Sequence, residues 1–162
     1  MLTIRRQALL IALVVLLDQV TKSWAVSALA DGRVIHIIGS LQFSLGFNSG
    51  FAFSQGQGLG PLVGIFAIIA VAFLFRAVRK ATTQLSAVAL CAIVAGAIGN
   101  IADRIFRGEG WLHGRVVDFI DLQWFPVFNV ADSSITVGAC ALIAAMLMEA
   151  RSGKGVDNTH ES

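Results

Sequence analysis

Long apolar stretches dominate the pattern of this chain and predict four helices that cross a membrane. A helix needs about 20 predominantly apolar residues to span the hydrocarbon core of a bilayer. Two of the four stretches carry no charged residue, whereas the first contains Asp18 and Lys22 and the last contains Asp132 near its start. The predicted spans cover about residues 8–30, 59–75, 81–102 and 129–148.

The composition supports the same class of protein. Hydrophobic residues make up 56% of the 162 residues and charged residues only 14%, and the mean hydropathy is +0.77. A soluble domain carries about 25% charged residues, so this chain has too few to cover a water-facing surface. With only two prolines and two cysteines, collagen and a disulfide scaffold are excluded, and the high apolar fraction excludes disorder. We expect one integral membrane domain over residues 1–162.

Basic residues beside the spans predict their orientation, because cytoplasmic flanks are enriched in Lys and Arg. With four spans, seven basic residues fall on one side: Arg5, Arg6, Arg76, Arg79, Lys80, Arg151 and Lys154. Both termini and the short turn between the second and third spans are therefore expected in the cytoplasm. The long loops at residues 31–58 and 103–128 then face outward. The same residues supply most of the net charge of +2, so no nucleic-acid partner is predicted.

A cleaved signal peptide over residues 1–30 is the competing interpretation of the first span. Arg5-Arg6, the apolar run 8–17 and Ala28-Leu29-Ala30 imitate the three regions of such a peptide. The stretch from Asp18 to the supposed cleavage site is too long and too polar for this role. An uncleaved first helix is therefore favoured.

The first outer loop carries the pattern of a small β-sheet. Residues 34–38 are rich in β-branched side chains, and the following Gly39-Ser40 suits a two-residue hairpin turn. Residues 41–48 then alternate between apolar and polar side chains, which is typical of a half-buried strand. We therefore predict an all-α membrane protein whose first two helices are joined through a small extracytoplasmic sheet, which we call the cradle.

Small residues in the third predicted span indicate close helix packing. Ala92 and Gly96, and likewise Ala95 and Gly99, are spaced four residues apart. Pairs of this kind let two membrane helices approach closely. Packing alone is a sufficient explanation for Gly99.

Cysteine, histidine and serine chemistry find little support. Cys91 and Cys140 lie in apolar surroundings in the middle of two spans, and we expect both to be buried. His36, His113 and His160 are scattered, so a metal site built on them is not expected. No Ser-x-x-Lys, nucleophile elbow or H-E-x-x-H motif is present. No metal or cofactor is predicted.

Asp18 and Lys22 lie four residues apart on one face of the first predicted helix. An ionisable group inside a span costs about 2.5–3.5 kcal/mol, so such groups are paired or functional. Mutual pairing would offset the cost for both. A structural buttress is favoured over direct chemistry.

Three other carboxylates, Asp103, Asp118 and Asp132, are expected at the outer membrane boundary. Two carboxylates a few Å apart cannot both ionise, so one keeps its proton while the other acts as a base. Such a dyad can activate a water against an amide and then protonate the leaving amine. Alternatively, these acids cap helices or pair with the nearby basic residues Arg104, Arg107 and Arg115. Spacing alone leaves both interpretations open.

Five sequence blocks, in order between residues 10 and 135, resemble the lipoprotein signal peptidases, the signal peptidase II family. The blocks are D-Q-V-T-K at 18–22, N-S-G-F-A-F at 48–53, G-A-I-G-N-I-A-D-R at 96–104, V-V-D-F-I at 116–120 and F-N-V-A-D-S-S-I at 128–135. One block would be a weak signal, whereas five on a four-span topology are very specific. Ala95 departs from the family pattern, in which a glycine often precedes Gly96.

The resemblance implies an aspartic endopeptidase of the bacterial cytoplasmic (inner) membrane. Such enzymes remove the signal peptide from prolipoproteins that bear a diacylglyceryl group on a Cys, and they cut just before that Cys. The implied catalytic pair is Asp118 and Asp132. The family also implies contact with membrane lipids and inhibition by globomycin. Implied substrate-binding or supporting positions are Asn48, Asn100, Arg104, Asn129, Asp18, Lys22, Asp103 and Gly96.

Two other functions compete with the peptidase. A proton-coupled exporter could use Asp18, because intramembrane acids mark proton paths; such a protein would have short loops. A non-enzymatic assembly factor could bind partners through the cradle, and it would not require both Asp118 and Asp132. Cleavage of a lipidated substrate that depends on both residues separates the three functions.

Overall fold

A computed structural model of the chain describes residues 2–50 and 60–157. Within this part, four helices are long and apolar enough to cross a membrane, which confirms the four predicted spans. The helices extend beyond the predicted spans at the start of the first and at the ends of the other three, and they fall one to three residues short at the remaining limits. Residues 51–53 of the second family block lie outside the described residues. The helices are α1 (Ile4–Ala28), α2 (Gly60–Arg79), α3 (Gln84–Phe106) and α4 (Val130–Asp157).

Helix α3 is the central element of the bundle. It packs against α1, α2 and α4, and 56% of its membrane-spanning window is buried, compared with 17% for each of the other helices. Its small residues allow this packing: a Cβ on Gly96 would lie 2.7 Å from Ile135 of α4, and a Cβ on Gly99 would lie 2.5 Å from the Asp18 carboxylate of α1. Larger side chains there would force the helices apart, as the small-residue pattern predicts.

Apolar side chains on the outer faces of the bundle are exposed, as expected of a surface covered by lipid. On α1 the exposed apolar side chains include Leu9, Leu13, Leu16, Leu17 and Val20. Cys91 is buried, but Cys140 is exposed. The prediction that both cysteines are buried is therefore wrong for Cys140, which shares the outer face of α4 with Val137 and Ile143. An apolar window predicts a span without saying which face meets lipid.

The cradle is a three-stranded antiparallel sheet in the order β1-β2-β3. The strands are β1 (Ile35–Ile38), β2 (Leu41–Asn48) and β3 (Val116–Asp121). Ile38 pairs with Leu41 across the predicted two-residue turn, where Gly39 has a φ of 56°. The third strand comes from the second outer loop, between α3 and α4, and places the V-V-D-F-I block in the sheet.

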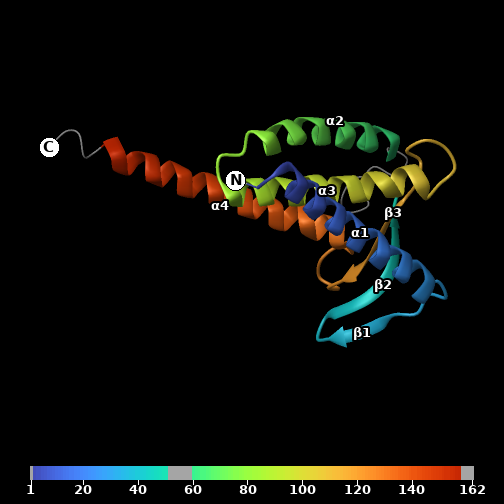
Figure 1. Cartoon of the computed structure of the whole chain (residues 1–162). Helices are drawn as coiled ribbons and strands as arrows, with labels where there is room; N and C mark the ends of the chain where they lie inside the picture. The colour runs from blue at the N-terminus through green and yellow to red at the C-terminus, as the bar shows by residue number, and fades with distance from the viewer. Residues whose placement is uncertain (1, 51–59, 158–162) are drawn as a thin grey trace.

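An aromatic cluster attaches the cradle to the end of α1. Trp24 of α1 lies edge-on to Phe43 of β2, with ring centroids 5.3 Å apart, and to Phe119 of β3, at 6.1 Å. Contacts of this geometry add to the apolar burial of the rings. The cradle therefore lies at one end of the bundle, whereas both termini and the α2–α3 turn lie at the other (Figure 1).

Candidate active site

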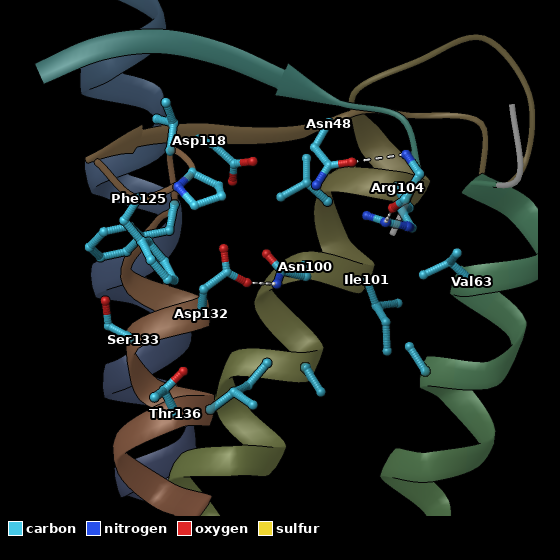
Figure 2. A pocket seen from close by; sticks show the side chains of 18 of the residues that line it. Asn48, Val63, Asn100, Ile101, Arg104, Asp118, Phe125, Asp132, Ser133 and Thr136 are labelled. Atoms are coloured by element: carbon cyan, nitrogen blue, oxygen red, sulfur yellow. Dashed lines mark hydrogen bonds between the residues drawn. The ribbon is translucent and has the colours of Figure 1, made fainter. Parts of the chain in front are cut away.

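A cavity of about 720 Å³ opens where the cradle meets the ends of α2, α3 and α4. Figure 2 shows carboxylate, amide and guanidinium groups directed into the cavity, with the apolar side chains of Val63 and Ile101 across from Asp132 and the hydroxyl residues Ser133 and Thr136 below it. Its polar lining includes Asn48, Asn100, Arg104, Asp118, Asp132 and Ser133. Five of these six residues were predicted from the sequence as site residues.

Asp118 enters the cavity from β3. It is 6% exposed, between the buried residues Val117 and Phe119. Its Oδ1 accepts a hydrogen bond of 2.7 Å from Nδ2 of Asn129. Burial, together with the nearby charge of Asp132, raises the pKa of Asp118 to about 7. The carboxyl group can therefore hold or release a proton near neutral pH.

Asp132 enters the same cavity from the first turn of α4. Its Oδ1 accepts a hydrogen bond of 2.8 Å from Nδ2 of Asn100, which is drawn in Figure 2. Its backbone N–H donates to Oδ1 of Asn129 at 2.9 Å, so Asn129 caps the start of α4. Asn129 thus contacts both acids: its Nδ2 binds the Asp118 carboxylate and its Oδ1 fixes the turn that carries Asp132.

Asp103 lies behind this site and does not line the cavity. It shares Nζ of Lys22 with Asp18, at 2.9 Å from each carboxylate, and all three side chains are almost fully buried. Asp103 also accepts hydrogen bonds from Arg107 Nε (2.8 Å) and from the backbone N–H of Val117 (3.1 Å). The predicted pairing of Asp18 with Lys22 is confirmed, and Asp103 joins this pair.

The structure thus divides the three outer carboxylates of the sequence analysis. Asp103 forms ion pairs with Lys22 and Arg107. This agrees with the alternative in which these acids pair with nearby basic residues. Within the described residues, Asp118 and Asp132 have amide partners and no ion pair within 4 Å. Among the acids that the structure describes, only these two line the cavity.

Arg104 carries unused hydrogen-bond donors into the cavity. Its Nη2 donates to the carbonyl of Gly50 at 2.7 Å, and its Nε and Nη1 are buried with no partner among the described residues. Buried donors of this kind are costly unless a partner arrives. Asn48 lines the same side of the cavity, and its Oδ1 accepts from the Gly50 N–H at 2.9 Å.

The loop between β3 and α4 was not predicted as part of the site. Residues 124–128 line the cavity, and their rings stack edge-on in a chain from Trp124 through Phe125 to Phe128, with centroids 6.0 and 5.8 Å apart. A run of three aromatic residues within five positions of an outer loop could have signalled them. Gln19, which donates to Asp18 and Asp103 at 3.1 Å, was also missed.

Two acids in such a cavity can perform general acid–base chemistry. Low polarity and mutual repulsion favour a state in which the pair holds one proton. Among the described residues, no three His, Cys, Asp or Glu side chains converge in a way that could hold a metal ion.

Comparisons with known proteins give a consistent result. The sequence profile of the family described as Signal peptidase (SPase) II matches residues 10–148. The chain is 42% identical over 147 residues to the lipoprotein signal peptidase of Mycobacterium leprae, covering 88% of this chain and 73% of that protein. It is 39% identical over 139 residues to the lipoprotein signal peptidase of Bifidobacterium longum subsp. infantis, covering 85% and 75%. A solved bacterial membrane enzyme superposes with a TM-score of 0.76 at 33% identity, covering 89% of this chain and 94% of that one.

The raised pKa of Asp118 predicts that this residue destabilises the fold at high pH. Between about pH 4 and pH 7 the folded protein binds a proton at Asp118 that the unfolded chain does not, so the free energy of unfolding falls as pH rises through this window. Asp118→Asn keeps the acceptor for Asn129 and removes the ionisation. We expect it to increase the free energy of unfolding by about 2–4 kcal/mol at about pH 8 and to change it little at about pH 4.

Unfolding in detergent, followed by tryptophan fluorescence at both pH values, measures this difference. Asp121→Asn is the matched control, because Asp121 lies on the same strand and its carboxylate accepts hydrogen bonds from Gln42 and Ser44. The control should show no gain at high pH. Equal stability of Asp118→Asn and the wild type at about pH 8 would show that burial does not hold a proton on Asp118.

Proposed function

Since the chain belongs to the signal peptidase II family, we propose that it is a membrane peptidase that removes signal peptides from prolipoproteins by a two-aspartate mechanism. The substrate is a prolipoprotein that carries a diacylglyceryl group on a Cys, and the bond cut is the peptide bond before that Cys. One observation carries the proposal: two acids, the buried Asp118 and the half-buried Asp132, converge on one cavity beneath the cradle. The family membership supplies the substrate class.

In the proposed reaction the two acids act as a base and an acid in turn. The ionised carboxylate takes a proton from a water molecule, and the water oxygen attacks the carbonyl carbon of the scissile amide. The protonated acid then donates its proton to the nitrogen as the C–N bond breaks, which releases the new amino terminus on the Cys. The cavity shields these transfers from bulk water, so each charge acts in a medium of low polarity.

The lining of the cavity suits an extended peptide attached to lipid. The unpartnered nitrogens of Arg104 and the amide of Asn48 can bind substrate carbonyl groups. Val63 and Ala67 of α2 and Ile135 of α4 are among the apolar residues of the lining, which can hold hydrocarbon or an apolar side chain. We expect globomycin to compete for this cavity.

The competing functions lack comparable support. The exporter requires that Asp18 take up and release protons, but Asp18 is 1% exposed and is held by Lys22 and by the backbone N–H of Ala131. An assembly factor has no need for two acids that face one cavity. The peptidase accounts for both acids.

We propose that the protein is a multi-pass component of the bacterial cytoplasmic membrane with its active site at the outer face. Basic residues of the α2–α3 region and of both termini support this orientation. A diacylglyceryl group holds a substrate Cys at the headgroup level, where the cradle and the cavity would then lie.

The mechanism predicts that either acid is indispensable for cleavage. Purified protein in lipid is incubated with a diacylglyceryl-modified prolipopeptide and with the same peptide unmodified. We expect Asp118→Asn and Asp132→Asn each to lower kcat/KM by at least about 10³-fold while remaining folded, since Asn cannot transfer a proton. The wild type should cut the modified peptide before the Cys and leave the unmodified peptide intact.

Asp121→Asn serves as the control, since it changes an acid of the same strand that does not line the cavity; its rate should stay close to that of the wild type. Near wild-type rates in either Asp118→Asn or Asp132→Asn would contradict the two-aspartate mechanism. An inert wild type would contradict the peptidase itself.

The proposed orientation is tested by labelling in intact cells. In a protein whose Cys91 and Cys140 are replaced by Ala, single cysteines are placed at Ser40, in the cradle turn, and at Thr82, between α2 and α3; both positions are exposed. A membrane-impermeant maleimide should label Ser40→Cys in intact cells and Thr82→Cys only after the cells are lysed. The reverse pattern would place the cradle in the cytoplasm.

A further inference from the structure

The amide of Asn100 connects the buried Lys22 cluster to one acid of the proposed active site. Nζ of Lys22 donates to Oδ1 of Asn100 at 2.9 Å. On its other side, Nδ2 of Asn100 donates to Oδ1 of Asp132 at 2.8 Å. A single side chain of α3 thus joins α1 to the acid carried by α4.

The orientation of this amide is fixed by chemistry. A lysine ammonium carries three donors and no acceptor. If the Asn100 amide were flipped, its NH₂ group would face the NH₃⁺ group of Lys22, and its oxygen would face a carboxylate. Lys22 therefore obliges Nδ2 of Asn100 to face Asp132.

Asn129 is fixed in the same way from the other side of the site. Its Oδ1 accepts from the backbone N–H of Asp132 at 2.9 Å, and a backbone N–H can only donate. Its Nδ2 must therefore face Asp118, whose Oδ1 lies 2.7 Å away. Each acid of the pair thus meets an amide N–H at Oδ1.

An oxygen that faces an N–H donor accepts a hydrogen bond, and the oxygen of a carboxyl group that carries the acid proton is a much poorer acceptor than an oxygen without it. We propose that Lys22 is a positioning residue. Through Asn100 it keeps Oδ1 of Asp132 as a hydrogen-bond acceptor. Asn129 has the equivalent effect on Oδ1 of Asp118, and the two effects together confine the shared proton to the two Oδ2 atoms. The inference rests on the proposed peptidase function. It assigns the proton to the oxygens that have no amide partner among the described residues and are free to meet water and substrate.

Lys22 acts on Asp132 through its hydrogen bond to Asn100, because neighbouring side chains balance its charge. Asp18 and Asp103 each contact Nζ at 2.9 Å, and Arg107 in turn pairs with Asp103 at 2.8 Å. These four side chains together carry no net charge. The charged groups that interact electrostatically with the pair of acids include Asp18 and Lys22 from α1 and Asp103 and Arg104 from α3.

Two variants of equal charge separate the hydrogen bond from the charge. In the Asp18→Asn background, Lys22→Gln keeps a donor for Asn100, whereas Lys22→Met removes it at similar length. The readout is the acid side of the pH profile of kcat for a diacylglyceryl-modified prolipopeptide. We expect the midpoint of this acid side to lie about one pH unit higher in Lys22→Met than in Lys22→Gln. Loss of the donor destabilises the ionised form of the pair of acids and so raises the pH at which the pair ionises.

The same shift must depend on Asn100. Asn100→Leu alone should move the midpoint upward by about one unit, and adding Lys22→Met and Asp18→Asn to it should change the midpoint by less than about 0.3 unit. Gln19→Leu is the control for damage to the buried cluster, because Gln19 contacts Asp18 and Asp103 but not Asn100. Its midpoint should equal that of the wild type.

Should the Lys22 variants fail to fold, Asn100→Asp carries the test, since it retains an acceptor for Lys22 and presents Asp132 with a carboxylate oxygen in place of the donor. An unchanged acid-side midpoint in Asn100→Asp, or equal midpoints for the Met and Gln variants, overturns the role of Lys22. Either result, with cleavage still dependent on Asp118 and Asp132, leaves the peptidase intact. Cleavage that survives Asp118→Asn or Asp132→Asn overturns the peptidase mechanism instead.

Discussion

The burial of the Lys22 ammonium is the interaction on which the rest of this structure depends. Lys22 is fully buried, and its three donors are used by Asp18, Asp103 and Asn100. Removing one member of such a group leaves an unpaired buried charge, which is far more costly than a lost surface ion pair. The second oxygen of Asp18 accepts the N–H of Ala131 at the start of α4, and Asp103 accepts the N–H of Val117 in the cradle. One cation therefore fixes the positions of α1, α3, α4 and β3 relative to one another.

This arrangement of the helices and the strand brings the two acids of the site together. Asp118 follows Val117, which Asp103 binds, and Asp132 follows Ala131, which Asp18 binds. Each carboxylate of the buried cluster thus accepts the backbone N–H of the residue that precedes one acid of the cavity. The close contacts of α3 at Gly96 and Gly99 allow this arrangement, since larger residues would displace α4 and Asp18. The charges behind the site are satisfied by ion pairs with one another.

Much of the fold could be predicted from the sequence because its signals are local. The four spans, the Gly39-Ser40 hairpin and the pairing of Asp18 with Lys22 each depend on residues close together in the chain. The third strand could not be predicted, because residues 116–121 pair with β2 across about 75 positions of sequence. The separation of Asp103 from the cavity also depends on the distant Lys22. Among the site residues, Asp118 and Asp132 were selected through the family blocks, whereas the contribution of residues 124–128 to the cavity required the three-dimensional structure.

The central claim is that Asp118 and Asp132 share one proton in the cavity. Infrared spectroscopy of the purified protein tests it directly, because a protonated carboxyl group has a C=O band that an ionised one lacks. The spectrum of the double variant Asp118→Asn/Asp132→Asn is subtracted from that of the wild type at a series of pH values. The account predicts one protonated-carboxyl band at about pH 6 that is lost as pH rises through about 7 and that persists in Asp121→Asn. A difference spectrum with no such band at about pH 6 would show that both acids are ionised and would contradict the account.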